Sequence, residues 1–127
     1  MRLAGIAAVI LLAVVEVFQI ALALGAPLGK ASWGGKHDGV LPTRLRIASG
    51  VAAVVVYPLI ILFVLAASGW VDTSLTEGTR RVGMWVLAGL LALGALANFV
   101  SRSKIERLWG PVSLALAICC GLIARGI

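Results

Sequence analysis

The sequence predicts an all-α integral membrane protein, an up-down bundle of four helices. Hydrophobic residues make up 61% of the chain and charged residues only 13%, whereas a soluble domain carries about a quarter charged residues. The apolar residues are collected in four long runs, separated by polar connections. A chain of 127 residues forms one domain and is too short to enclose so much apolar surface in water.

Each apolar run has the length of a membrane span, which needs about 20 predominantly apolar residues. The fourth run reaches this length only if its helix begins within 105–109, ahead of Pro111. The proline then lies in the first turn or two of that helix or marks a kink. We predict a single transmembrane domain over 1–127, with helices at about 3–24, 47–69, 82–100 and 105–124.

A cleaved signal peptide is the alternative interpretation of the first run. The chain opens with Met1-Arg2, and Ala21-Leu22-Ala23 resembles a small-x-small cleavage site. The run is long for a signal peptide, however, and Glu16 interrupts its apolar part. We therefore predict that it is the first spanning helix.

The connections indicate the topology. The first, residues 25–46, is long and rich in glycine and proline, a composition that favours turns. The segments 70–81 and 101–109 are short. Short links make consecutive helices antiparallel neighbours, as in an up-down bundle.

The basic residues predict an orientation. We name the end with the first and third connections side B, and the end with both termini side A. Side B carries Lys30, Lys36, Arg44, Arg46, Arg102, Lys104 and Arg107, whereas side A carries Arg2, Arg80, Arg81 and Arg125. The positive-inside rule then places loops 25–46 and 101–109 in the cytoplasm and both termini outside. The tryptophans fall at the predicted interfaces, Trp33 and Trp109 towards side B and Trp70 and Trp85 towards side A.

Glu16 is the most informative polar residue. It lies inside the first apolar run, and we expect it near the bilayer midplane, where an unpaired charge costs several kcal/mol. Gln19 follows at i+3, on the same helix face. Intramembrane acids commonly mark pathways or relays, but the pair could equally hydrogen-bond a neighbouring helix and set its packing.

Tyr57 is expected at a similar depth on the second helix, directly before Pro58, which should kink that helix. We predict a buried polar site formed by Glu16, Gln19 and Tyr57, with Cys119 and Cys120 at comparable depth. The simpler alternative is a hydrogen bond from Tyr57 to Glu16 that satisfies both. Closer to side B, a polar vestibule could be formed by Ser49, Asn98, Ser101 and Ser113. The commoner alternative is that these side chains only cap helices or bond across them.

The first loop combines glycines, prolines and basic residues. Anionic lipid headgroups are the predicted ligands of its cations, which are Lys30, Lys36, Arg44 and Arg46. The alternative is a basic loop that only sets topology. The neighbours His37 and Asp38 are too few ligands for a metal site.

Two segments also carry a resemblance, GAPLGKASWGGKHDGVLPTRLRIASG in the first loop and NFVSRSKIERLWGPV later. They resemble a family of small bacterial four-transmembrane-helix proteins with a GAPLGxxxWGG…GVLPxxLR first loop. The resemblance covers most of the chain. It implies a bacterial inner (plasma) membrane protein and brings no catalytic residues with it.

Two classes of function remain open. The first is a transport or permeation unit, expected to be a homo-oligomer, that uses the polar site around Glu16. The second is a non-catalytic accessory or lipid-binding protein that acts through the basic first loop and the small-residue helix faces, with the bilayer or another membrane protein as partner. No catalytic set, phosphate loop or cofactor motif is present in the sequence, so an enzyme is not expected. Nucleic acid is not an expected partner either, since no basic stripe interleaved with aromatics occurs.

Overall fold

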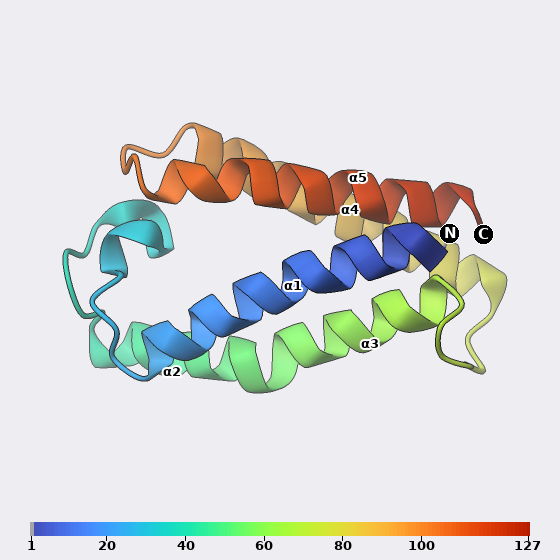
Figure 1. The fold of residues 1–127 in the computed structure, drawn as a ribbon, viewed down its shortest axis with the longest axis horizontal. Helices are drawn as coiled ribbons and strands as arrows, with labels where there is room; N and C mark the ends of the chain where they lie inside the picture. The colour runs from blue at the N-terminus through green and yellow to red at the C-terminus, as the bar shows by residue number, and fades with distance from the viewer. Residues whose placement is uncertain (1) are drawn as a thin grey trace.

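The computed structural model describes residues 2–127, and these residues form helices and loops without a β-strand (Figure 1). The long helices are joined by turns and by short 3₁₀ or π segments. In chain order the elements are α1 (Arg2–Ala23), η1 (Gly29–Ala31), η2 (Trp33–Gly35), α2 (Thr43–Val51), η3 (Ala52–Val56), α3 (Tyr57–Ala67), α4 (Glu77–Phe99), η4 (Glu106–Leu108) and α5 (Trp109–Arg125).

The helices form four spans, each long and apolar enough to cross a membrane. They are Arg2–Ala23, Thr43–Ala67, Glu77–Phe99 and Glu106–Arg125. Successive spans run in opposite directions, and the N- and C-termini lie at the same end (Figure 1). The prediction of an all-α four-helix bundle is confirmed, and the chain is a multi-pass membrane protein.

Two spans begin earlier than the apolar runs indicated. The second begins at Thr43 and the third at Glu77, so the first connection is shorter than 25–46. The Thr76 side chain accepts a hydrogen bond from the backbone N–H of Thr79 at 3.1 Å. This N-cap stabilises a polar first turn that hydrophobicity alone does not reveal.

The second span contains a π segment rather than a simple kink. The Tyr57 N–H donates to the carbonyl of Ala52, five residues earlier. Pro58 follows directly and has no N–H to continue the α-helical pattern. The wider turn changes the direction in which Tyr57 projects, and such π-bulges are frequent at functional sites.

The spans pack unequally. Helix α1 packs against α5 and against the second span, α4 packs mainly against α5, and α3 makes few contacts with α4. Large apolar side chains on the outer faces are exposed, as on α4 at Leu90, Leu93 and Leu96. These faces are suited to contact with lipid chains.

The apolar core lies in the half of the bundle towards side A. Its members come from the side A halves of all four spans, namely Ala4, Ala8, Leu12, Val64, Ala67, Met84, Ala88, Leu116, Cys120, Ile123 and Ala124. Cys120 is fully buried in this cluster and Cys119 packs against it. The expected polar layer therefore does not include the two cysteines, because their helix turns them into the apolar core. Close packing of apolar side chains makes this half of the bundle unfavourable for water.

The first loop folds back over the side B end, where Figure 1 shows it between the end of α1 and the start of α5. Its path is closed by a hydrogen bond from the Gly29 N–H to the Gly39 carbonyl at 2.8 Å. Trp33 has a left-handed φ of 50° and is followed by two glycines with positive φ. A bulky residue in this region is strained, and such strain is common at functional sites.

Candidate functional site

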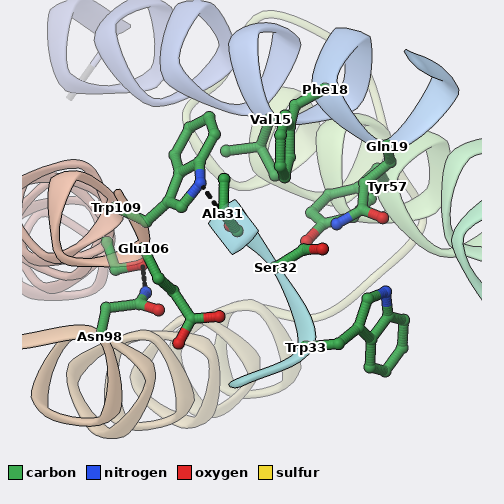
Figure 2. A pocket seen from close by; sticks show the side chains of 11 residues that line it. Val15, Phe18, Gln19, Ala31, Ser32, Trp33, Tyr57, Asn98, Glu106 and Trp109 are labelled. Carbon is green, nitrogen blue, oxygen red and sulfur yellow. Dashed lines mark hydrogen bonds between the residues drawn. The ribbon is translucent and has the colours of Figure 1, made fainter. Parts of the chain in front are cut away.

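A cavity of about 250 Å³ lies in the side B half of the bundle, between the apolar core and the first loop. Every span contributes to its wall, and residues 31–33 of the loop complete it (Figure 2). Its polar lining residues are Gln19, Ser32, Tyr57, Asn98, Glu106 and Ser113. The cavity and the core divide the bundle into a polar half and a closed apolar half.

Gln19 and Tyr57 meet at one side of the cavity, with their side chains next to each other (Figure 2). Gln19 Oε1 is buried and has no hydrogen-bond partner among residues 2–127. A buried acceptor without a partner is costly.

Glu16 is placed one turn further from side B than Gln19 and does not line the cavity. Because α1 ends at Ala23, Glu16 lies about two turns, or roughly 10 Å, from the end of the helix. This is shallower than the midplane position expected from the sequence. Its Oε1 is buried without a partner among the described residues. The structure thus brings Gln19 and Tyr57 together at the cavity, whereas Glu16 lies outside its wall.

Glu106 supplies a carboxylate from η4 on the opposite side. Its side chain is 6% exposed, and Oε2 accepts a hydrogen bond from the Gly34 N–H at 2.8 Å. Ser103 Oγ also donates to the carbonyl of Lys30. The third connection therefore holds the first loop over the cavity, with Glu106 facing the cavity (Figure 2).

Aromatic side chains form much of the remaining wall. Phe18 and Trp109 pack against each other, with ring centroids 4.7 Å apart and planes tilted by 47°. The Trp109 indole N–H donates to the Ala31 carbonyl at 3.0 Å, and the Trp33 indole N–H donates to Ser49 Oγ at 3.1 Å. Both indoles are fixed by these bonds, so their ring faces have defined positions.

The expected vestibule exists only in part. Asn98 Nδ2 donates to Ser113 Oγ at 3.4 Å, and both side chains line the cavity. Ser49 is fully buried and bonds to Trp33 instead. Ser101 Oγ accepts from the backbone N–H of Ser103, which is a turn interaction within the third connection.

The four basic residues of the predicted headgroup site separate into two groups. Lys30, Lys36 and Arg44 are exposed. Arg46 is half-buried, and its Nε donates to the Ala23 carbonyl at 3.3 Å. A cation at this position satisfies the end of α1 and complements the helix dipole, so Arg46 has a structural role inside the bundle.

Comparison with protein-family models, with curated proteins and with solved structures gave no match to this chain. The interpretation of the site therefore depends on its own geometry. Sequence reasoning missed Glu106 as a site residue. The signal was present, because Glu106 is the single acid in a connection that also holds Arg102, Lys104 and Arg107, but its approach to the first loop spans 72 positions of sequence.

Proposed function

We propose that this protein is a transport or permeation unit that binds a small polar solute in the cavity at side B. The supporting observation is the division of the bundle, with a polar cavity in one half and a closed apolar core in the other. A transporter that alternates between two access states needs a site that is separated from one side at a time.

The division has a simple physical basis. A polar side chain inside the bilayer is costly unless it meets other polar groups or lines a cavity. Gln19, Tyr57, Asn98 and Glu106 come from four different segments and face one space. Because α3 and α4 make few contacts, the second span is free to move relative to α4. Such a movement would allow the core to open.

We further propose that the protein resides in a bacterial inner membrane, with loops 25–46 and 101–109 in the cytoplasm. The excess of lysine and arginine at side B supports this orientation. The resemblance of the first loop to the bacterial four-helix family supports the bacterial membrane.

Cysteine accessibility tests the proposal without knowledge of the solute. In a Cys119→Ala, Cys120→Ala background, Ser113→Cys places one thiol in the cavity. A small membrane-impermeant methanethiosulfonate reagent is applied to vesicles of each orientation. We expect modification from both sides, because a transport cycle exposes the same site alternately.

Two loop positions control for sidedness. Ser74→Cys, in the exposed side A connection, should react only from outside the cell. Lys104→Cys, in the exposed side B connection, should react only from the cytoplasm, and the reverse pattern would invert the proposed orientation. If Ser113→Cys reacts from one side only, or from neither, the transport proposal is wrong.

A second function, binding of anionic lipid by an accessory protein, is favoured by the exposure of Lys30, Lys36 and Arg44 at side B. Each basic residue near an anionic surface contributes about 1 kcal/mol, or roughly fivefold in affinity. Replacing all three with glutamine should sharply reduce the fraction of spin-labelled phosphatidylglycerol held at the protein in nanodiscs. Arg125→Gln, at exposed side A, is the control, and an unchanged fraction in the triple variant would exclude this function.

A further inference from the structure

We infer that the solute of this cavity is a small organic ammonium ion. The inference rests on the proposed function in taking the cavity as the solute site, and it adds the chemical class. The charge of the wall and its aromatic side chains support it independently.

The charge of the wall is negative. Among residues 2–127, the lining includes one carboxylate, that of Glu106, and no lysine, arginine or histidine. Glu106 is 6% exposed, and its one protein hydrogen bond from Gly34 occupies Oε2. A buried carboxylate with no cation in the wall is stabilised by a positively charged ligand.

The wall also offers hydrogen-bond acceptors to a ligand. The indole N–H groups of Trp33 and Trp109 are already used. The Ser32 hydroxyl donates to Gly29, and the Asn98 amide donates to Ser113. Glu106 Oε1 and Asn98 Oδ1, in contrast, accept no hydrogen bond from the described part of the chain. An ammonium group only donates hydrogen bonds and can use these acceptors.

The aromatic wall favours an organic cation over a hydrated inorganic one. Phe18, Trp33, Tyr57 and Trp109 all line the cavity. Aromatic faces attract a cation whose charge is partly desolvated, and they also pack against an alkyl group. A strongly hydrated metal ion would gain little from such walls.

Calorimetric titration of the full-length protein in nanodiscs tests the inference. The probes are propylammonium chloride, potassium chloride at equal ionic strength, and propan-1-ol as a neutral molecule of similar size. We expect saturable binding of propylammonium alone. Binding of potassium with equal affinity, or of propan-1-ol with equal affinity, would overturn the assignment.

Variants identify the groups responsible. Glu106→Gln keeps an acceptor for the Gly34 N–H but removes the charge, and it should weaken propylammonium binding by about a hundredfold. Phe18→Leu should weaken it by about fivefold through loss of an aromatic face. Glu77→Gln, at an exposed acid in the first turn of α4, should leave it unchanged. Binding unaffected by Glu106→Gln would show that the cation binds elsewhere.

The two proposals can fail separately. Propylammonium should also protect Ser113→Cys from modification. If propylammonium protects Ser113→Cys but the thiol is modified from one side only, the ammonium site is supported and the transport proposal is wrong. If the thiol is modified from both sides and propylammonium does not protect it, transport is supported and the solute is not an ammonium ion.

Discussion

Replacing Glu16 with glutamine is expected to stop the transport cycle while leaving membrane insertion and stability unchanged. Glu16 Oε1 makes no hydrogen bond to residues 2–127, so the isosteric change breaks no internal contact. The substitution removes an ionisable carboxyl group from the membrane-spanning part of α1, and intramembrane acids commonly mark pathways or relays. The readout is the rate at which Ser113→Cys is modified from side A, with thermal melting as the measure of stability.

The exposed acid Glu77 provides the matched control, since Glu77→Gln should not alter side A modification. Infrared difference spectroscopy, comparing the native protein with Glu16→Gln, identifies the carboxyl band of Glu16. We expect this band to change when propylammonium is added, because Glu16 lies one helical turn from Gln19, which lines the cavity. If Ser113→Cys is modified from side A at the same rate in Glu16→Gln, and the carboxyl band of Glu16 does not respond to propylammonium, Glu16 is a packing residue. That result would favour the accessory function.

Replacing Glu106 with alanine is expected to release the first loop from the side B end. The substitution removes the acceptor of the Gly34 N–H, and a hydrogen bond to a charged group contributes about 1.5–3 kcal/mol. The open form of the loop should therefore become roughly tenfold to a hundredfold more populated. Hydrogen–deuterium exchange of the backbone amides in residues 28–36 measures this change directly.

Glu106→Gln separates the two roles of this residue. The amide oxygen can still accept from Gly34, so exchange in the loop should remain near that of the native protein although ammonium binding is lost. If Glu106→Ala leaves exchange unchanged, the loop is held by other contacts. These are the bonds from Trp109 to Ala31, from Ser103 to Lys30 and from Trp33 to Ser49, and Trp109→Phe, which removes the indole N–H, then becomes the informative variant.

The helical spans were predictable because each is a local property of the chain. A spanning helix satisfies its own backbone hydrogen bonds and needs only a sufficient length of apolar sequence. The errors fall at Thr43 and Glu77, where polar first turns extend the helices beyond the apolar runs. A hydrophobic pattern does not register such turns. At Glu77 the Thr76 side chain caps the first turn, and at Thr43 the preceding Pro42 marks the start of the helix.

The residues of the candidate site were predictable only where the depth of a residue along its helix was enough to place it. Counting from the loops placed Glu16, Gln19 and Tyr57 in one layer; in the structure Gln19 and Tyr57 line the cavity and Glu16 does not. The same counting placed Cys120 there, but the rotation of α5 turns it into the apolar core. Depth follows from sequence position, whereas the face that a helix presents to the bundle depends on its neighbours.

The sequence by itself determined the class of the protein, the number of its spans, the end that carries the basic loops and the presence of an acid within the first span. These follow from composition and from the fixed thickness of a bilayer. Only the tertiary structure decided that the polar groups line one half of the bundle while the other half is closed, and that Glu106 joins Gln19 and Tyr57 at one cavity. The reason is that helix rotation and the return path of the first loop depend on contacts between distant segments, such as Gly34 with Glu106, which local patterns do not specify.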